Sequence, residues 1–331
     1  RARLQGAGLQ AQLDYWRGHL AGLPPVHSLP LDRPRPARQH FAGGRINHDI
    51  DRATVEALGA LGRKHDATLF MVLEAAFAAL LSRWSGEHDI AVGTLIAGRV
   101  HQDIEPLIGF FVNTLVLRTD LSGDPDFLAV LAQTRSLALA AYEHQDVPFE
   151  MLVEDLNPAR SLAHNPLFQI AFSMRNNEQP ILELPGLTVA PLSKNEAELA
   201  MFDLQLSATE HDRGMRLSWL YARHLFDEAN IERLSAAYLR LLEGVLAAPE
   251  APMSGLSLLG DGDAALIARW NDSAQAYDRD ATIHEVFQAQ AAATPQASAL
   301  IFDGVHLSYA ELNRRANRIA HRLIAHGVKR G

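Results

Sequence analysis

Short apolar segments with a strand pattern alternate with amphipathic helical segments through residues 40–248, and this alternation limits the fold more than any other feature of the sequence. The four clearest strand patterns lie at residues 89–96, 110–118, 167–174 and 215–221. Other strands are indicated at residues 45–50 and 202–209, and helices at residues 53–64, 68–84, 126–143, 148–156 and 227–247. Because alternating helices and strands pack as layers around one core, we predict an α/β lobe in which the four clearest strands share one sheet.

A helix and a proline-rich connector precede this lobe. Residues 9–20 place apolar side chains at helical spacing, which predicts an amphipathic helix. Five prolines then fall between Pro24 and Pro36. Because proline lacks an N–H group and fixes φ, we expect this segment to be an extended connector on the surface.

A second boundary follows Ala248, where proline, glycine and aspartate become frequent. This change divides the chain into a lobe at residues 1–248, a linker at residues 249–281 and a further unit at residues 282–331. Fifty residues cannot bury a full core of their own. We therefore expect the last unit to be the beginning of a larger domain.

The last unit has its own pattern of elements. Helices are predicted at residues 283–293 and 309–326. Between them, Asp303-Gly304 separates two apolar runs. An Asp-Gly pair in that position predicts a β-hairpin.

Charge and cysteine content exclude several classes of function. The 331 residues carry 30 basic and 39 acidic side chains, a net charge of −9, which argues against binding nucleic acid or an anionic membrane through bulk charge. The absence of cysteine excludes disulfides and thiolate chemistry and is typical of a cytoplasmic protein. The longest apolar segment, residues 67–81, contains Glu74 and is too short to span a bilayer. Because the chain begins with Arg1 and not with methionine, we expect a piece of a longer protein.

The first motif is Ile108-Gly109-Phe110-Phe111-Val112-Asn113-Thr114. Gly109 would let another backbone approach closely, and Asn113 places an amide on an otherwise apolar strand. Two interpretations remain open for this motif. It belongs either to a binding groove or to a core strand with one satisfied polar side chain.

The second motif is His144-Gln145-Asp146-Val147-Pro148-Phe149-Glu150. We expect Asp146 to cap the helix that Pro148 opens. His144 is a candidate general base, but its place beside a cap, with no adjoining nucleophile, is more typical of a structural histidine. A third motif contains Asn165-Pro166, a pair that forces an extended turn into the next strand.

In this order and spacing, the three motifs resemble the fifth, sixth and seventh signature motifs of the condensation domains of nonribosomal peptide synthetases. Flanking segments agree with that family, among them Gln12-Leu13-Asp14-Tyr15-Trp16, Gly98-Arg99 and Phe202-Asp203-Leu204. The resemblance covers about residues 1–248. The first core motif of the adenylation domain that follows in such synthetases is similar to a segment containing Leu307, Ser308, Tyr309, Glu311 and Leu312.

The resemblance implies a chloramphenicol-acetyltransferase-like lobe, with a mixed sheet and flanking helices, followed by the truncated start of an adenylate-forming (AMP-binding) domain. It implies that the parent synthetase joins an upstream carrier-bound thioester to a downstream aminoacyl thioester, next to an ATP-dependent amino-acid-activating domain. The implied partners are the missing N-terminal lobe, the upstream and downstream carrier proteins and the rest of the adenylation domain. Phosphopantetheine on the carriers, ATP and Mg²⁺ are the implied cofactors, none of them expected to bind this chain alone.

The family also has a motif that this chain lacks. Condensation domains carry their active site as His-His-x-x-x-Asp-Gly, and none of the fifteen histidines here is followed by another. We therefore assign no catalytic residue to this chain and expect it to be inactive alone. Arg99 is the candidate partner for the aspartate of that motif, since Gly98 lets the chain turn toward the groove. Without that aspartate we expect Arg99 to be under-paired and to face the open side.

The remaining candidates for groove or structural roles are Gly109, Phe110, Asn113, His144, Gln145, Asp146, Asn165 and Pro166. Two other functions stay open beside the synthetase. A stand-alone acyltransferase would need its own histidine beside a cleft, for which His144 and His164 are the candidates, and a non-catalytic docking unit for carrier proteins is compatible with the acidic charge. A metal site is not expected, because His40 and His48 have no acidic residue at ligand spacing.

Overall fold

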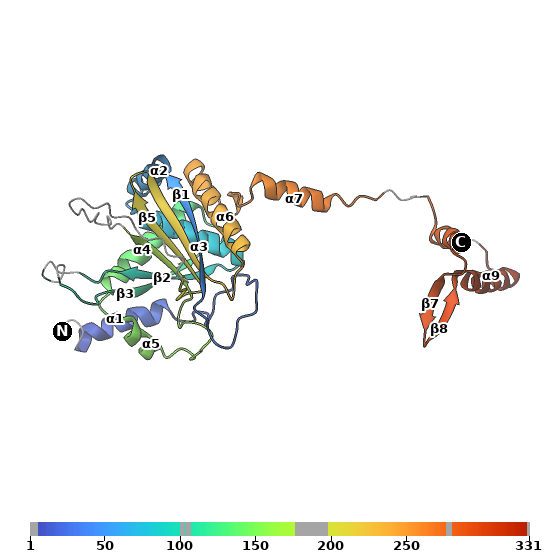
Figure 1. The fold of residues 1–331 in the computed structure, drawn as a ribbon, viewed down its shortest axis with the longest axis horizontal. Helices are drawn as coiled ribbons and strands as arrows, with labels where there is room; N and C mark the ends of the chain where they lie inside the picture. The colour runs from blue at the N-terminus through green and yellow to red at the C-terminus, as the bar shows by residue number, and fades with distance from the viewer. Residues whose placement is uncertain (1–5, 100–102, 104–106, 176–197, 276–279, 330–331) are drawn as a thin grey trace, which may run out of the picture. The chain divides into compact units, whose positions relative to one another are not determined.

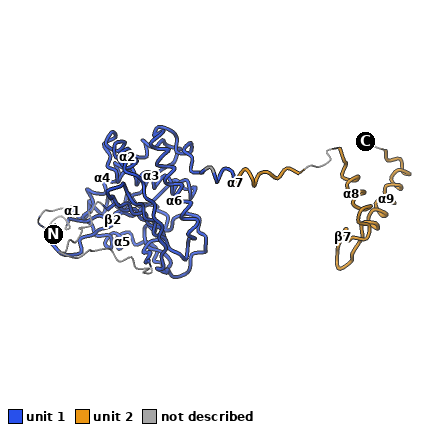
Figure 2. The backbone as a smooth tube through the Cα atoms, turned by 45° about the horizontal axis from the view of Figure 1, so that its top comes forward, with its two compact units in different colours: residues 1–265 blue, residues 266–331 orange. Residues whose placement is uncertain are grey.

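The computed structural model describes residues 6–99, 103, 107–175, 198–275 and 280–329. The chain forms two compact units, residues 1–265 and residues 266–331 (Figure 2). The division falls inside α7 (Asp261–Asn271), a helix that lies within the segment predicted to be a linker. Unit 1 contains the predicted lobe, and unit 2 contains the predicted start of a second domain.

A six-stranded mixed sheet organises unit 1 (Figure 1). In spatial order its strands are β1 (Gly43–Asp51), β6 (Gly214–Ala222), β5 (Leu204–His211), β4 (Ile170–Arg175), β2 (Asp89–Ile96) and β3 (Asn113–Asp120). Strand β4 runs parallel to both β2 and β5, and all other neighbours are antiparallel. The prediction that the four clearest strand patterns share one sheet is confirmed.

Strand β1 joins the sheet through a partner far along the chain. Gly43 lies opposite Ala222, and Asp51 lies opposite Gly214. The antiparallel register therefore links segments more than 160 residues apart. Among the described strands β6 is the only one paired with β1, so β1 forms an edge of the six-stranded sheet, with an isolated antiparallel bridge between Ala42 and Leu199 just before it.

The strand predicted at residues 110–118 begins later than expected, at Asn113. Asn113 pairs with Ile96, which is the last residue of β2. No strand that the structure describes is therefore paired with residues 110–112, and Phe110 is 91% exposed. The apolar character of these positions belongs to a surface and not to a buried strand.

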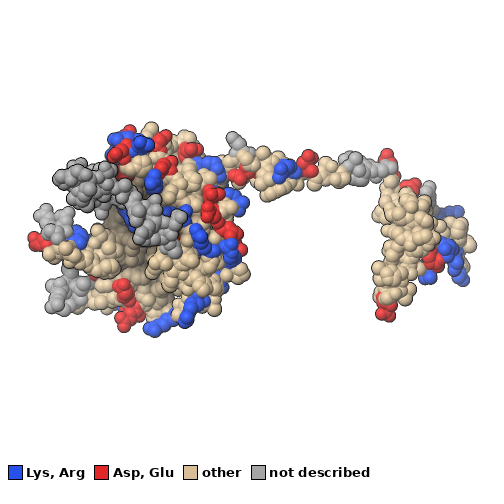
Figure 3. All heavy atoms as spheres, in the orientation of Figure 1, with Lys and Arg blue, Asp and Glu red and all other residues tan. Residues whose placement is uncertain are grey.

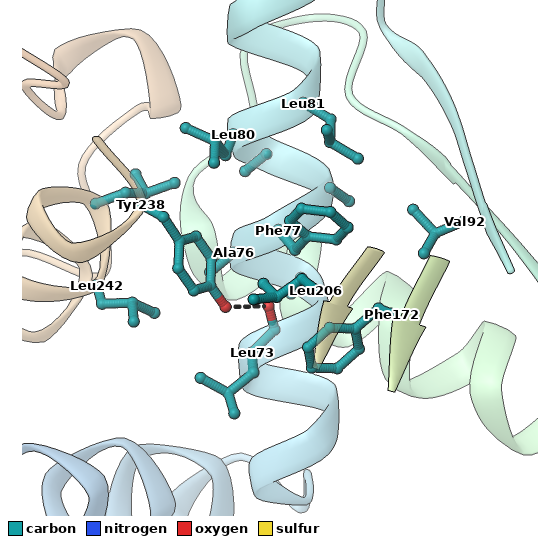
Figure 4. Packing of buried hydrophobic residues seen from close by; sticks show 14 of the residues in the cluster. Leu73, Ala76, Phe77, Leu80, Leu81, Val92, Phe172, Leu206, Tyr238 and Leu242 are labelled. Atoms are coloured by element: carbon teal, nitrogen blue, oxygen red, sulfur yellow. Dashed lines mark hydrogen bonds between the residues drawn. The ribbon is translucent and has the colours of Figure 1, made fainter. Parts of the chain in front are cut away.

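Helix α3 (Leu69–Ser85) forms the centre of the larger core and contacts both α4 (Phe127–Glu143) and α6 (Glu228–Ala247). Every residue of α3 from 71 to 82 is buried. The ring of Phe77 contacts the rings of Trp219 and Tyr238, and the Tyr238 hydroxyl donates to the carbonyl oxygen of Leu73 at 2.8 Å (Figure 4). This packing joins α3 to β6 and α6, as expected for a helix whose apolar face is broad enough for a core.

Glu74 is enclosed in this core although it is acidic. Both carboxylate oxygens are buried and have no hydrogen-bond partner among the described residues. Burial raises the pKa of Glu74 to about 7, and the Thr134 hydroxyl opposes this shift only in part, since no hydrogen bond of normal geometry joins the two side chains. Below that pH the carboxyl is neutral, which is the form that an apolar core accommodates at lower cost.

Most helices begin where the sequence indicates. Asp51 caps α2 (Arg52–Lys64) by accepting the N–H of Thr54, and Asp126 caps α4 in the same way. Helices α1 (Gly6–His19) and α5 (Phe149–Leu156) pack in a smaller cluster with β3. Among the described helices none is by itself long and apolar enough to cross a bilayer, and only α2 and α3 taken together, bent by 98°, have that length and composition.

The first part of the predicted linker packs against unit 1. Met253 and Leu256 are buried, and the guanidinium of Arg83 donates to both of their carbonyl oxygens, at 2.8 Å to that of Met253. Ser254 donates to the Asp124 carboxylate through both its backbone N–H and its hydroxyl. Met253 and Leu256 therefore belong to the core of unit 1, although the proline and glycine content of their surroundings is typical of a linker.

Unit 2 consists of α8 (Ile283–Ala293), a hairpin of β7 (Ser298–Phe302) and β8 (Val305–Ser308), and α9 (Tyr309–Ala325). The predicted hairpin is confirmed, with Asp303 and Gly304 both at positive φ, 48° and 73°. Ala291 is the one buried residue in the described part of unit 2. The prediction that this unit cannot build a full core agrees with that exposure.

Candidate functional site

The first two motifs meet at one pocket. Its volume is about 360 Å³, and one wall is formed by residues 110–113 and the other by residues 145–150. Its lining residues are Gly98, Phe110, Phe111, Val112, Asn113, Gln145, Asp146, Pro148 and Glu150. Aromatic rings, two carboxylates and two side-chain amides thus surround one concave surface. We call it the motif pocket.

Asn113 joins the two walls. Its Nδ2 donates to the carbonyl oxygens of Gln145 at 2.9 Å and Val147 at 2.8 Å. Its Oδ1 accepts the N–H of Thr114 at 2.8 Å and that of Phe149 at 3.1 Å. Of the two interpretations that the sequence left open, the satisfied polar side chain describes Asn113, although the residue also lines the pocket.

The expected cap of α5 is wrong. The helix begins at Phe149, and its N-cap Pro148 offers no side-chain hydrogen bond. Asn113, which lies 36 positions before Phe149 on strand β3, supplies the acceptor instead. Asp146 contacts α1, where its Oδ2 lies 3.5 Å from Nε2 of Gln12. Asp146 is therefore engaged by tertiary packing, which a local capping rule does not take into account.

Gly98 lines the pocket, and Arg99, the next residue, contacts Phe111, which also lines it. Gly98 has a φ of +63°, and a Cβ at this position would collide with the carbonyl oxygen of Phe111. The guanidinium carbon of Arg99 lies 4.5 Å from the centre of the Phe111 ring. The expectation that Arg99 would be under-paired is wrong, because the chain folds Phe111 back beneath the guanidinium, a favourable cation–π arrangement.

Gly109 differs from its expected role. A Cβ there would lie 2.8 Å from the ring of Phe111. The glycine therefore makes room for a neighbouring aromatic ring and not for another backbone.

His144 is held by packing with α1. Its ring stacks on that of Tyr15 at 4.0 Å between centroids, and its Nδ1 lies 2.7 Å from the carbonyl oxygen of Ala140. The indole Nε1 of Trp16 donates to the backbone carbonyl of His144 at 3.0 Å. His164, the other candidate base, has Nδ1 3.1 Å from the Asn165 carbonyl oxygen. The contacts of His144 are those of a structural histidine, whereas His164 also lines a cavity of about 330 Å³. Gln145 uses its Nε2 to donate to the Tyr142 carbonyl oxygen.

The third motif lies elsewhere in unit 1, where it holds the proline-rich connector. Asn165 donates to the Met201 carbonyl oxygen at 2.6 Å. Gln169 donates to the carbonyl oxygen of Pro25 and accepts the N–H of His27. Asn165 and Pro166 are therefore not brought to the motif pocket, and Pro166 instead lines a separate cavity of about 330 Å³ beside the connector.

A buried ion pair on the same connector was not found from the sequence. The Asp203 side chain is 1% exposed, and its Oδ2 accepts from Arg35 at 2.6 Å and from His27 at 2.9 Å. Burial raises the pKa of Asp203, but the hydrogen bonds from His27 and Arg35 outweigh it and leave the pKa below its ordinary value. The sequence offers only two local indications of this pair: Arg35 lies in the proline-rich segment, and Asp203 directly precedes a strand.

Arg118 is a second residue that sequence reasoning missed. It makes a two-pronged ion pair with Asp89, at 2.8 and 2.7 Å. Its Nη1 donates to the carbonyl oxygens of His19 and Ala21, at the end of α1. A cation at the C-terminus of a helix satisfies its last carbonyl groups, so Arg118 fixes α1 on the sheet.

The residues of the predicted adenylation motif stabilise α9 and its junction with the hairpin. Ser308 caps α9 by accepting the N–H of Glu311 at 3.3 Å, and Glu311 pairs with Arg314 and Arg315. Tyr309 contacts the ring of Phe287 at 5.9 Å between centroids. Leu307 and Leu312 are partly buried at the junction of the hairpin and the helix. In the part of the chain that the structure describes, no three His, Asp or Glu side chains form a group that could hold a metal ion.

Comparison with known proteins identifies both parts of the chain. The model of the condensation domain matches residues 1–268, and that of the AMP-binding enzymes matches residues 287–331. Malpinin synthetase of Mortierella alpina is 42% identical over 99% of this chain, and tyrocidine synthase 2 of Brevibacillus parabrevis is 40% identical over 99% of it. The chain spans only 4% and 9% of the lengths of these two curated relatives.

Solved structures agree with this result. A four-domain nonribosomal peptide synthetase bound to AMP and glycine superposes with a TM-score of 0.80 at 25% identity, covering 98% of this chain and 26% of that one. The X-domain from teicoplanin biosynthesis superposes with a TM-score of 0.71 at 32% identity, covering 78% of this chain and 59% of that one. The resemblance and the α/β fold class predicted from the motifs are thus confirmed. The chain belongs to the condensation-domain family of nonribosomal peptide synthetases and runs on into the beginning of an AMP-binding domain.

Proposed function

We propose that this chain supplies the C-terminal lobe of a condensation domain that forms peptide bonds between carrier-bound substrates. In this proposal the amine of a downstream aminoacyl thioester attacks the carbonyl carbon of an upstream thioester. A C–N bond forms, the C–S bond breaks, and the amine loses a proton while the sulfur leaves as a thiol. The observation that supports it is the motif pocket, where two family motifs meet within a lobe of that family.

The domain limits follow from the same proposal. Residues 1–248 would form the condensation lobe, residues 249–281 the linker and residues 282–331 the beginning of the adenylation domain. The partners would be an upstream lobe with His-His-x-x-x-Asp-Gly, the two carrier proteins and the remainder of the adenylation domain.

The proposed cofactors belong to those partners. The phosphopantetheine arms are carried by the carrier proteins. The residues described in unit 2 do not fit ATP and Mg²⁺, because they include no glycine-rich phosphate loop and because Arg314 and Arg315 are engaged by Glu311. No step of the reaction is therefore assigned to a nucleotide on this chain.

Arg99 is the proposed contact with the upstream lobe. Stacking on Phe111 holds one face of its planar guanidinium. The N–H groups of a guanidinium lie in its plane, which is the geometry that a two-pronged bond with a carboxylate requires. In the complete domain we propose that the aspartate of His-His-x-x-x-Asp-Gly receives them and that the pair fixes the loop which carries the catalytic histidine.

The test compares this chain with a completed domain. With loaded carriers, the chain alone should form no peptide bond, whereas the same chain joined to an upstream lobe with His-His-x-x-x-Asp-Gly should form dipeptidyl carrier. In the completed domain, Arg99→Ala should lower the rate and cost about 3–5 kcal/mol of stability by leaving a buried carboxylate unpaired. Arg63→Ala, an exposed arginine on α2, is the matched control.

Three outcomes would contradict the proposal in different ways. Turnover by the chain alone would mean that it contains its own base. Carrier binding without turnover by the completed domain would favour a docking unit, and the teicoplanin X-domain is a relative that was crystallised in complex with OxyB. Equal rates and stabilities for wild type and Arg99→Ala would remove Arg99 from the interface.

A further inference from the structure

The two walls of the motif pocket come from distant parts of the chain, and the hydrogen bonds of one side chain cross between them. Three of the four hydrogen bonds of the Asn113 amide reach residues 145–149, which lie 32 to 36 positions further on. Two N–H donors and two acceptor positions are all that a primary amide has. Asn113 therefore has no hydrogen-bonding capacity left for a ligand: three of its bonds join the walls, and the fourth reaches Thr114 on its own strand.

One of these bonds holds the beginning of α5. The first N–H groups of a helix have no partner within the helix, and Pro148 provides none. The N–H of Phe149 is satisfied by Asn113 from β3. Glu150, the next residue of α5, lines the pocket, so the position of its carboxylate depends on a residue of the opposite wall.

The other wall also depends on Asn113. It is the first residue of β3, opposite Ile96 at the end of β2. The exposed segment 110–112 enters the sheet there, and Phe111 in that segment lies beneath Arg99. A shift at Asn113 would therefore move Phe111 and the guanidinium that rests on it.

We propose that Asn113 is a positioning residue that sets the width of the motif pocket, without touching the substrate. It holds the carboxylate wall formed by Asp146 and Glu150 at a fixed distance from the aromatic wall that carries Arg99. The effect of Asn113 on catalysis rests on the proposed function, whereas its effect on the geometry of the pocket does not. The two can therefore be separated by experiment.

Two substitutions test the geometry on the full chain. Asn113→Leu keeps the approximate volume but removes all four hydrogen bonds, and amide exchange at Phe149 should become at least tenfold faster. Asn113→Asp keeps the shape but turns the two donors into a carboxylate oxygen that faces the carbonyls of Gln145 and Val147. The two facing carbonyl oxygens should raise the pKa of this carboxyl above its ordinary value of about 4, and the protonated acid can again donate to one of them, so exchange relative to wild type should recover as the pH falls.

Activity is measured in the completed domain. Both variants should lower kcat/KM for condensation at least tenfold at pH 8. Asn113→Asp alone should recover toward the wild-type value measured at the same pH as the pH falls, a pH profile that loss of packing would not produce. Asn47→Asp is the control, since Asn47 lies on the other edge strand, where its amide oxygen accepts from Ser218. It should change neither exchange at Phe149 nor condensation.

The outcomes separate this proposal from the one it rests on. If wild-type completed domain forms no peptide bond, the proposed function fails, while exchange at Phe149 still decides the geometry. Unchanged exchange in Asn113→Leu would overturn the role of Asn113 in the pocket. Faster exchange with condensation within twofold of wild type would overturn its role in positioning.

Discussion

Helices α3 and α9 have the same length, seventeen residues, and opposite surroundings. Twelve residues of α3 are buried, whereas α9 has none, and Ile319 and Leu323 on α9 are 62% and 49% exposed. Both helices have an N-cap side chain, Thr68 for α3 and Ser308 for α9, and α9 adds ion pairs from Glu311 to both Arg314 and Arg315. Local signals place a helix, but burial against other elements supplies most of its stability.

The same contrast separates the two units as chemical environments. In unit 1 a helix can enclose a titratable group, as α3 does with Glu74. On the face of unit 1 seen in Figure 3, acidic and basic side chains are interspersed with apolar and neutral ones. In unit 2 the charges of α9 remain at the surface, where solvent screens them.

The largest expected effect is the loss of a ring from the core. Phe77→Ala should lower the free energy of unfolding by about 3–5 kcal/mol, because the cavity would adjoin Phe172, Trp219 and Tyr238. The matched change on the exposed helix, Leu323→Ala, should leave the main urea transition where it is. Equal destabilisation by the two substitutions would mean that α9 is packed as tightly as α3.

The second effect depends on pH. Folding raises the pKa of Glu74 from 4.5 to about 7, so the folded state keeps a proton that the unfolded state has already released. This stabilisation is fully present below pH 4.5 and is lost as the pH rises to 7, a loss of about 3 kcal/mol. Glu74→Gln should remove the dependence, so that the variant matches wild type near pH 4.5 and exceeds it near pH 8.

Urea unfolding at several pH values checks this result. Glu243→Gln, at an exposed position of α6, is the control and should leave the profile of wild type unchanged. If the free energy of unfolding of the wild-type protein did not change with pH, Glu74 would be hydrated in solution and the prediction would be wrong.

The third effect concerns how α1 is held. Arg118→Met keeps most of the side-chain length but removes the pair with Asp89 and two bonds to the end of α1. We expect a loss of about 1–2 kcal/mol, because partly exposed charged hydrogen bonds contribute less than buried ones. Amide exchange should rise in α1 and remain unchanged in α6. Uniform acceleration throughout unit 1 would show that α1 is part of the main cooperative core.

The smallest effect compares two helix caps. Asp51→Ala at α2 and Ser308→Ala at α9 remove the same kind of bond, worth about 1 kcal/mol. In α2 the loss should appear in the midpoint of the main unfolding transition. In α9 it should appear only as reduced helicity of unit 2, by circular dichroism and exchange. If Ser308→Ala shifted the midpoint of the main unfolding transition, the two units would unfold cooperatively, which would contradict this prediction.

Periodicity was sufficient to predict most of the fold. The strands around residues 89–96 and 215–221 alternate or remain apolar over their whole length, and helix 283–293 is placed with the predicted bounds. Helix α7 was missed because glycine and aspartate near its start are typical of a loop. The start of β3 was misplaced because Phe110 and Val112 have strand-like side chains, whereas pairing depends on where β2 ends.

The candidate site was less accessible to sequence reasoning. Several residues of the first two motifs line the pocket, among them Phe110, Gln145 and Asp146. Their bonds could not be predicted, because the amide of Asn113 reaches backbone atoms more than thirty positions away. The pair between Arg35 and Asp203 spans 168 positions, and no local rule connects two such residues.

The pairing of β1 with β6 has a consequence for synthesis on the ribosome. Residues 43–51 emerge more than 160 residues before their partner strand, which at typical rates of translation is a delay of roughly ten to thirty seconds. Throughout that interval the backbone of β1 and the side chains of Ile46 and Ile50 have no sheet to join. In nascent chains stalled before residue 214, the amides of β1 should therefore exchange freely and chaperones should be able to bind the strand. Once the chain is released past residue 222, pairing with β6 should protect these amides.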